Sequence, residues 1–421
     1  MAVTVTQCAV LVGGLGTRLG TLTATTPKPL LPCADRPFLS WLLREFVRYG
    51  VTDFLLLTGH LSAEVERAAA AIEAALPQSL PGSPARPVRI TVSEEPQRAG
   101  TGGAVYHARD RLAEQFLLCN GDSLFDCGLS NLLAAGADDP AEIVGRVMLR
   151  QLDDASRYGV VGLDGDRITA FHERPPQGTA GIINGGVYLF RRSLLDYMQP
   201  VCSLEADVMP RLASAGALRG TLGDGYFRDI GVPGDFARAQ SEIPARLRRR
   251  ALFLDRDGVL NRDHGYVGSR DQFEWIDGAL DAIRYATAAG WHVFIVTNQS
   301  GVARGKYDES DVHDLMAWVC DEARRHGGTI DDWRFCPYHP EASVERYRRA
   351  HPWRKPMPGM LLDLLSAWEV DADRAVMIGD QQTDMQAADA ACVPGYFFTV
   401  GNLLSFVRPI LDKHAGNRTT E

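Results

Sequence analysis

The chain has 421 residues, more than one hydrophobic core of ordinary size usually holds, so we expect two domains. Its hydrophobic content of 45% and charged content of 23% are typical of a globular protein in water. A net charge of −9 gives no support for nucleic-acid binding, which usually requires a basic face.

Targeting and membrane signals are not found in the sequence. No apolar run reaches the roughly 20 residues that span a bilayer. Residues 1–10 lack the basic start and long apolar core of a signal peptide. The eight cysteines form no Cys-x-x-Cys pair, which favours reduced thiols over a disulfide framework. We therefore expect a cytoplasmic protein without a membrane partner.

The first half of the chain alternates predicted strands and helices. A strand from Cys8 leads into the glycine-rich turn GGLGTRLG. An apolar face with helical spacing predicts a helix over residues 37–50, followed by a strand over 53–58. A helix from Ser62 and a strand over 89–93 follow. This alternation predicts a parallel sheet covered on both faces.

The basic run ARLRRR, residues 245–250, is interpreted as a solvated helix end or linker between domains 1–243 and 249–421. After it come predicted strands over 251–254, 291–297 and 375–379, with helices from Asp277 and over 308–326. Both domains are therefore predicted to be α/β, and ligands are expected at the carboxyl ends of their strands.

Charged side chains follow the strands of the first domain. The glycine-rich turn carries Arg18, and TPKPLLP holds Lys28 between two prolines. Glycines let backbone N–H groups approach a polyphosphate, and the cations can neutralise its charge. Asp122, in NGD after a strand, and Asp229, in RDIGVPGD, are candidate ligands of Mg²⁺.

In order, GGLGTRL, TPKPLLP, AGTGGA, NGD, HERP, NGGVYLF and RDIGVPGD resemble the motifs of sugar-1-phosphate nucleotidyltransferases, over roughly residues 7–240. The resemblance implies a Rossmann-like fold and attack of a sugar 1-phosphate on the α-phosphate of a nucleoside triphosphate, releasing pyrophosphate. It implies Mg²⁺ on Asp122 and Asp229. It places the phosphates at Gly13, Gly14, Gly16, Arg18 and Lys28, the base near Gly102, and the sugar beside Glu173, Asn184 and Gly185.

The opening VGGLGTRL most resembles D-glycero-D-manno-heptose 1-phosphate guanylyltransferases. Guanine offers N1–H and N2–H₂ donors, so we hypothesise that the carboxylate of Glu94 or Glu95 accepts hydrogen bonds from the base. The alternative is that these glutamates are simply solvated. Two other kinds of substrate pair remain alternatives for this domain: mannose 1-phosphate with GTP, and the same heptose 1-phosphate with ATP or CTP.

The second domain opens with LDRDG. A carboxylate at a strand end, Asp255, can attack a phosphoryl group if a cation masks its charge. Asp257 can protonate the leaving alkoxide. Thr297, in VTNQSG, also ends a strand, and WRKPMPG supplies Arg354 and Lys355. In MIGDQQTDM, Asp380 or Asp384 is free to complete a Mg²⁺ site.

These four motifs resemble those of haloacid-dehalogenase-like (HAD-like) phosphatases, over roughly residues 249–405, and imply a Rossmannoid fold. In detail they resemble D-glycero-D-manno-heptose 1,7-bisphosphate 7-phosphatases, with histidinol phosphatases as close relatives. The resemblance makes Asp255 the phosphoaspartate and Asp257 the acid and base. Mg²⁺ would lie on Asp255, the Asp257 backbone and Asp380, and the phosphoryl group on Thr297 and Lys355. The residues that would touch substrate are His264, Tyr266, Asn298, Gln299, Ser300 and Arg354.

One loop departs from the pattern of these relatives, many of which bind zinc through a Cys-x-His pair and a Cys-x-Cys pair. Here the first pair is Cys336 and Tyr338, and the second is His351 and Trp353. Even with the nearby His339, tetrahedral zinc would lack a ligand. We expect a loop packed by aromatic side chains and no zinc.

The two implied reactions are consecutive. The phosphatase would leave the anomeric phosphate of a heptose 1,7-bisphosphate, and the nucleotidyltransferase would use that phosphate as its nucleophile. Histidinol would share no intermediate with the first domain, so the pairing favours heptose. An alternative is that one half is a catalytically silent regulatory module. The expected partners are these small molecules, including heptose 1-phosphate and a nucleoside triphosphate such as GTP.

Overall fold

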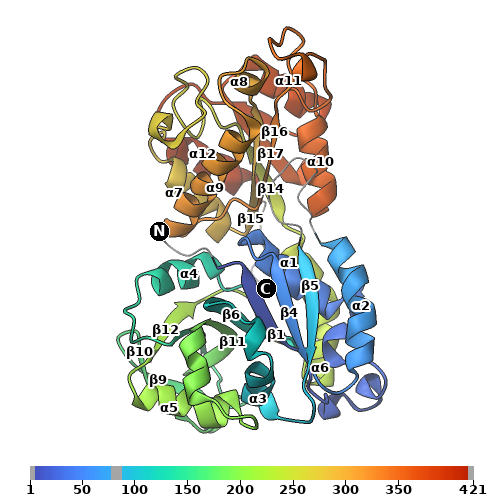
Figure 1. Ribbon diagram of the computed structural model, residues 1–421, viewed down its shortest axis with the longest axis vertical. Coiled ribbons are helices and arrows are strands. Elements are labelled where there is room, and N and C mark those ends of the chain that lie inside the picture. The colour runs from blue at the N-terminus through green and yellow to red at the C-terminus, as the bar shows by residue number, and fades with distance from the viewer. Residues whose placement is uncertain (1–4, 77–87, 416–421) are drawn as a thin grey trace. The chain divides into compact units, whose positions relative to one another are not determined.

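The computed structural model describes residues 5–76 and 88–415. Its described part divides into two compact units, residues 5–76 with 88–247 and residues 248–415 (Figure 1). None of the helices in these ranges combines the length and apolar character needed to cross a bilayer. Each unit is described in turn.

The N-terminal unit is built on a nine-stranded sheet in the order β5-β4-β1-β6-β11-β8-β12-β10-β9. Its first four strands, which run parallel, are β1 (Gln7–Leu11), β4 (Asp53–Thr58), β5 (Arg89–Glu94) and β6 (Gln115–Asn120). Their side chains alternate between two apolar layers, so Val10 and Leu56 face one core while Ala9 and Leu55 face the other. This half of the sheet agrees with the predicted parallel arrangement.

The other half of this sheet is mixed. It contains β8 (Gly145–Leu152), β9 (Val160–Asp164), β10 (Arg167–His172), β11 (Gly181–Arg191) and β12 (Leu218–Gly223). Strand β11 is antiparallel to both β6 and β8, and β10 is antiparallel to β9 and β12; only β8 and β12 run parallel. The prediction of a parallel sheet was therefore wrong for these strands, because the expected strand–helix alternation ends at β6.

Helices cover both faces of the N-terminal sheet. They are α1 (Phe38–Arg48), α2 (Ser62–Ala75), α3 (Gly100–His107), α4 (Leu129–Ala137), α5 (Met209–Ser214) and α6 (Pro233–Leu247). Residues of α1, α2, α4 and α6 pack in one core, and residues of α3 and α5 pack in the other. Two small ribbons complete the unit: β2 (Pro32–Cys33) with β3 (Arg36–Pro37), and β7 (Ser123–Phe125) with β13 (Phe227–Asp229).

The C-terminal unit has a five-stranded sheet in the order β16-β15-β14-β17-β18, and every pairing in it is parallel. The strands are β14 (Arg250–Leu254), β15 (Trp291–Asn298), β16 (Asp332–Cys336), β17 (Ala375–Gly379) and β18 (Gly395–Phe397). Buried Phe253 and Phe294 make ring contact across β14 and β15. Such nearly continuous apolar strands are those of a sheet covered on both faces.

Helices flank this second sheet (Figure 1). They are α7 (Ala279–Ala288), α8 (Ser300–Ala303), α9 (Glu309–Arg325), α10 (Gly359–Trp368), α11 (Gln382–Ala390) and α12 (Leu403–Ala415). Side chains of α7, α9 and α12 share one core with Leu252 and Ile295, and Trp368 of α10 contacts Phe294 on the other face. The predicted α/β class of both domains is confirmed.

The basic run at residues 245–250 is divided between two elements. Its first residues end α6 and Arg250 begins β14. Arg249 is only 4% exposed, so the expectation of a fully solvated run was wrong at this position.

Candidate active sites

A pocket of about 950 Å³ lies at the carboxyl ends of the parallel strands in the N-terminal unit. The glycine-rich turn after β1 forms one wall, and residues 94–98 with 100–101 form another. Gly16 has a φ of +63°, a left-handed conformation that favours glycine. A Cβ on Gly13 would lie 3.0 Å from the backbone nitrogen of Gly59, so a side chain there would crowd the turn after β4.

The ribbon of β7 and β13 brings the two predicted carboxylates together. Its register pairs Ser123 with Asp229, and Ile230 N donates to the carbonyl of Asp122 at 3.0 Å. Lys28 Nζ lies 2.6 Å from Asp122 Oδ2 and 3.5 Å from Asp229 Oδ1. The lysine is buried, whereas the Asp122 side chain is 38% exposed. Both carboxylates therefore contact the same cation, and this shared contact brings together two oxygen donors of the kind that Mg²⁺ prefers.

Arg18 belongs to the same cluster. A Cβ on Gly231 would lie 2.8 Å from Asp229 Oδ1, 2.9 Å from Lys28 Nζ and 3.0 Å from Arg18 Nη2. A side chain at this position would therefore have to displace these three charged groups. The site thus joins two cations and two carboxylates beside the glycine-rich turn, which suits binding of a polyphosphate with its metal.

The predicted residues of this domain divide into those that line the pocket and those that do not; Asp229, which contacts Lys28, is not among the lining residues. Those that line the pocket are Gly13, Gly14, Gly16, Arg18, Lys28 and Asp122, together with the hypothesised base readers Glu94 and Glu95. Gly102 is buried within α3 and its N–H donates to Cys202 O at 3.0 Å, while its neighbours Gly100 and Thr101 form the wall.

The predicted sugar residues lie outside this lining in the described part of the chain. Asn184 and Gly185 are in β11, where Asn184 Nδ2 donates to Tyr188 Oη at 2.8 Å. A Cβ on Gly185 would overlap the ring of Phe125, so this glycine permits close packing. Glu173 is exposed just after β10. Their assignment to the sugar stays a prediction.

Sequence reasoning missed one acidic residue of the pocket, Glu205, in the π-helical turn η5 (Leu204–Val208). Its Oε2 accepts a hydrogen bond from Thr101 Oγ1 at 2.6 Å. Because the two residues are 104 positions apart, no local motif could have joined them.

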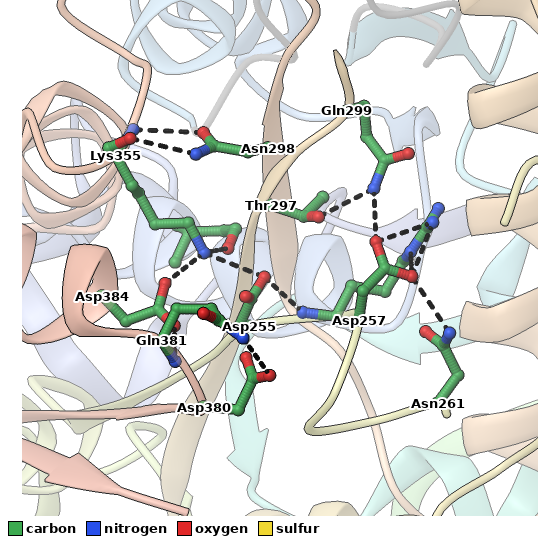
Figure 2. Close-up of polar contacts among 12 residues, drawn as sticks. Asp255, Asp257, Asn261, Thr297, Asn298, Gln299, Lys355, Asp380, Gln381 and Asp384 are labelled. Carbon is green, nitrogen blue, oxygen red and sulfur yellow. Dashed lines mark hydrogen bonds and ion pairs between the residues drawn. The ribbon is translucent and has the colours of Figure 1, made fainter. Parts of the chain in front are cut away.

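The second site lies where β14, β15 and β17 end. Lys355 Nζ is 2.9 Å from Asp255 Oδ1 and 2.6 Å from Asp384 Oδ1, and it donates to Val296 O at 3.0 Å (Figure 2). Lys355 is 2% exposed and Asp255 is 7% exposed. The flanking backbone is fixed as well, since Asn298 exchanges two hydrogen bonds with the backbone of Lys355. The predicted nucleophile and cation are thus in contact.

Three carboxylates of this site could hold a cation. Oxygens of Asp255, Asp380 and Asp384 all lie within 4.8 Å of one another. Asp380 Oδ1 is buried and has no hydrogen-bond partner within the described residues, so a cation would satisfy it. Gly258, with a φ of +85°, lets Asp380 approach, because a Cβ at this position would overlap Asp380 Oδ2. The residues fit Mg²⁺, and Asp384 supplies a carboxylate that the predicted ligand set leaves out.

Burial shifts the ionisation of the nucleophile. It raises the pKa of Asp255 to about 7, against the opposing effect of Lys355 and with a further increase from Asp384. Burial also raises the pKa of Asp380. The pKa of Lys355 is raised by its two carboxylate neighbours, Asp255 and Asp384, despite the desolvation that opposes it. A divalent cation would favour the ionised carboxylates that nucleophilic attack requires.

A separate hydrogen-bond network holds Asp257. Asn261 Nδ2 donates to its Oδ1 at 3.0 Å, and Gln299 Nε2 donates to its Oδ2 at 2.9 Å. Fully buried Arg256 pairs with the same carboxylate at 2.9 Å. The Asp257 side chain therefore points toward donors and away from the other three carboxylates, as Figure 2 shows. This agrees with a role in proton transfer and leaves only its backbone for a metal.

Gln299 connects this network to the other predicted groups. Its Nε2 also donates to Thr297 Oγ1 at 2.8 Å, and its Oε1 accepts from Tyr307 Oη at 2.6 Å. Gln299 itself is 1% exposed. We predicted a substrate contact for Gln299, but its contacts here orient Asp257 and Thr297. Arg256, Asn261 and Tyr307 were missed, and only the position of Arg256 between the two aspartates gave a local signal.

The other predicted substrate residues border the site at different depths. His264 and Tyr266 are exposed in the loop after β14, with His264 Nε2 3.2 Å from Glu274 Oε2 and Tyr266 at a φ of +59°. Ser300 begins α8 and Asn298 ends β15. Arg354 is partly buried, and its Nη1 donates to Tyr338 O at 3.2 Å.

The loop that departs from the zinc pattern is packed by rings. Tyr338 stacks on His351 with centroids 4.4 Å apart, and His351 meets Trp353 edge to face at 6.1 Å. Cys336 is buried, and burial raises the pKa of its thiol to about 11. His339 Nδ1 accepts from the backbone of Glu341. These contacts show how the substituted positions pack; the absence of zinc stays a prediction.

Comparison with known proteins defines the class. Residues 8–246, more than half of the chain, match the nucleotidyl transferase family, and residues 352–402 match the HAD-hydrolase-like family. The chain belongs to the nucleotidyl transferases and, through its C-terminal part, to the HAD-like phosphatases. The predicted pairing of two enzymes in one chain is confirmed.

Two curated relatives and one solved structure are similar to parts of this chain. The C-terminal part is 50% identical over 164 residues to the D-glycero-β-D-manno-heptose-1,7-bisphosphate 7-phosphatase of Rhodopseudomonas palustris, a match that covers 39% of this chain and 91% of the relative. The enzyme of the same name from Escherichia coli K12 is 46% identical over 143 residues, covering 34% and 75%. The crystal structure of HddC from Yersinia pseudotuberculosis complexed with GMP-PN matches with a TM-score of 0.48 and 26% identity, covering 56% of this chain and 98% of that one.

Proposed function

We propose that the C-terminal domain removes the 7-phosphate of D-glycero-D-manno-heptose 1,7-bisphosphate. The observation that carries this proposal is the buried contact of Asp255 with Lys355 beside two further carboxylates. The substrate is inferred from the relatives of that name, the first of which is 50% identical over nearly its whole length.

The residues of this site suggest a two-step reaction. An oxygen of Asp255 attacks phosphorus, and the bond from phosphorus to the sugar C7 oxygen breaks while Asp257 gives its proton to the departing alkoxide. Water then attacks the phosphoaspartate, Asp257 takes the proton of the water, and inorganic phosphate leaves. Lys355 and Thr297 neutralise and hold the phosphoryl oxygens. Mg²⁺, held by Asp255, Asp380 and Asp384, would supply the positive charge that lets two anions approach.

For the N-terminal domain, we propose transfer of a nucleotidyl group to the heptose 1-phosphate. A phosphate oxygen of the sugar attacks the α-phosphorus of a nucleoside triphosphate, and the bond to the β-phosphate oxygen breaks, releasing pyrophosphate. Arg18 and Lys28 stabilise charge on the transferring and leaving phosphates. Asp122 and Asp229 would hold Mg²⁺, which neutralises the triphosphate. The cluster around Lys28 supports this assignment.

GTP is the nucleotide that we favour. Glu94 and Glu95 both line the pocket, but Glu95 Oε2 already accepts from Ala99 N at 3.0 Å, whereas Glu94 is exposed. Glu94 therefore has the freer carboxylate for the N1–H and N2–H₂ donors of guanine. Competition of GTP with ATP in the Glu94→Ala and Glu95→Ala variants tests this. Retention of the GTP preference by both variants excludes the hypothesis.

The two reactions are separable by substitution. Asp255→Asn removes the phosphatase nucleophile, and we expect release of phosphate to stop while nucleotidyl transfer to supplied heptose 1-phosphate continues. Asp122→Ala is the reciprocal variant, and we expect it to retain phosphate release alone. If either variant lost both reactions, or retained both, the assignment of one reaction to each domain would be contradicted.

A further inference from the structure

One motif of the N-terminal domain, RDIGVPGD, is closed by an ion pair between its first and last residues. Arg228 Nη1 lies 3.1 Å from Asp235 Oδ1, across the turn that follows the predicted metal ligand Asp229. Asp229 comes directly after Arg228 in β13, and Asp235 lies in the first turn of α6. The pair therefore fixes the strand that carries Asp229 against the helix that follows it.

Asp235 contacts two further guanidinium groups. Arg157 Nη2 is 2.6 Å from its Oδ2, and Arg238 Nη2 contacts its Oδ1. The Asp235 side chain is only 3% exposed, whereas that of Arg157 is 49% exposed, so Arg157 reaches inward from the surface. Burial would raise the pKa of Asp235, but the hydrogen bonds from Arg157 and Arg238 outweigh burial and lower it overall. Asp235 is thus a buried, ionised carboxylate at which three arginines meet.

The segment between β8 and β9 is held over β13 by this carboxylate. Tyr158 of this segment meets Phe227 of β13 with ring centroids 6.0 Å apart. Side chains alternate between the two faces of a strand, so Phe227 and Asp229 share one face of β13 while Arg228 points to the other. The ion pair of the preceding residue, Arg157, therefore fastens the segment over the face that carries Asp229.

The carboxylate of Asp229 is oriented by the turn that Asp235 closes. Its Oδ1 accepts a hydrogen bond from Gly231 N at 2.6 Å and lies 3.5 Å from Lys28 Nζ. A shift of the turn would therefore move Asp229 relative to Asp122 and Lys28. Groups behind a metal ligand orient it, and their loss commonly weakens metal binding about 10- to 100-fold.

We propose that Asp235 is a positioning residue of the nucleotidyl-transfer site: by binding Arg228 and Arg157 it holds β13 and the segment over it together, and so sets where Asp229 presents its carboxylate to Mg²⁺. This inference rests on the proposed nucleotidyl transfer. It adds to that function a residue outside the pocket lining that acts through the strand beside it.

The test measures metal-dependent nucleotide binding by the full-length protein. Calorimetry gives the affinity for α,β-methylene GTP, which cannot transfer its nucleotidyl group, with saturating Mg²⁺ and with EDTA. The wild type should bind at least about tenfold more tightly with Mg²⁺. Asp235→Asn should bind about tenfold more weakly than the wild type with Mg²⁺, and less than about twofold more weakly without it. Asp235→Glu, which keeps the charge, should recover part of this loss.

Asp139→Asn is the matched control. The Asp139 side chain is 6% exposed and also binds two arginines, Arg146 at 2.8 Å and Arg219 at 3.5 Å, but it lies outside the lining of the pocket. This variant should leave both affinities unchanged. Phosphate release should stay within about twofold of the wild-type rate in every variant, because that reaction is assigned to the other unit of the chain.

Arg157→Gln provides the test if Asp235→Asn does not fold. Because the Arg157 side chain is half exposed, its replacement leaves the buried carboxylate with two arginines. This variant should bind the analogue at least about threefold more weakly with Mg²⁺, and with unchanged affinity in EDTA.

Several results would overturn the inference. Unchanged Mg²⁺-dependent affinity in Asp235→Asn, or in Arg157→Gln where the first variant does not fold, would exclude the positioning role. An equal loss with and without Mg²⁺, or the same loss in Asp139→Asn, would indicate a general structural role instead. Failure of the wild type to bind the corresponding analogue of GTP, ATP or CTP would refute the proposed nucleotidyl transfer itself.

Discussion

Gly258 provides a direct test of how the C-terminal site holds its metal. Two features disfavour any residue with a Cβ at this position: the φ of +85° and the closeness of Asp380 Oδ2. Alanine would incur roughly 1–2 kcal/mol for the left-handed conformation. Its Cβ would also displace the Asp380 carboxylate from Asp255 and Asp384. Loss of one well-placed carboxylate should weaken Mg²⁺ binding by about 10- to 100-fold, or about 1.4–2.8 kcal/mol.

Gly265 offers a matched control for the Gly258→Ala variant. It has a φ of +76°, and a Cβ there would meet nothing within 4 Å. Gly265→Ala should therefore carry the conformational cost alone, with unchanged affinity for Mg²⁺. Unfolding in urea can be followed by fluorescence, because six of the seven tryptophans lie beyond residue 247, and Mg²⁺ affinity by calorimetry. Equal Mg²⁺ affinity in the two variants would refute the role assigned to Gly258.

Three further predictions concern the same domain. Gln299→Leu should lower kcat for phosphate release by about 10- to 100-fold without changing Mg²⁺ affinity, because it removes hydrogen-bond donors to Asp257 and Thr297. Tyr307→Phe should lower kcat less. A change in KM without a change in kcat would contradict the role assigned to Gln299. Because the pKa of Asp255 is raised to about 7, Mg²⁺ must displace a proton from this carboxyl group below that pH. The apparent dissociation constant of Mg²⁺ should therefore rise about tenfold per pH unit as the pH falls from 7 to 5.5, and it should be constant above pH 7.5. A dissociation constant that does not change with pH over this whole range would exclude the raised pKa of Asp255. Elemental analysis of the purified protein should find no zinc, because Tyr338 and Trp353 occupy ligand positions of the zinc-binding relatives, and zinc near one equivalent would overturn this.

The strand-end residues could be predicted because their signals are local. Asp255, Thr297 and Asp380 each follow a short apolar run, and parallel strands bring their carboxyl ends to one edge of the sheet. In the N-terminal domain, Asp122 likewise follows a strand, β6. Lys28, which contacts Asp122, lies in a short 3-10 helix and was predicted from its motif and not from a strand end.

The parts that escaped prediction depend on contacts between distant segments. The antiparallel strand β11 pairs with β6 across more than 60 residues, and the ribbon that joins Asp122 to Asp229 pairs positions about 100 residues apart. Glu205 reaches its pocket through Thr101 in the same way.

The central claim is that one chain carries out two consecutive reactions on the same sugar. Phosphorus NMR of a single mixture of the protein, Mg²⁺, GTP and D-glycero-α-D-manno-heptose 1,7-bisphosphate tests it most directly. We predict inorganic phosphate first, followed by pyrophosphate and a GDP-linked heptose. Phosphate without any nucleotide sugar would contradict the role of GTP or the anomer used. Absence of phosphate with both the α and the β anomer of the bisphosphate would contradict the heptose assignment and the link between the two domains.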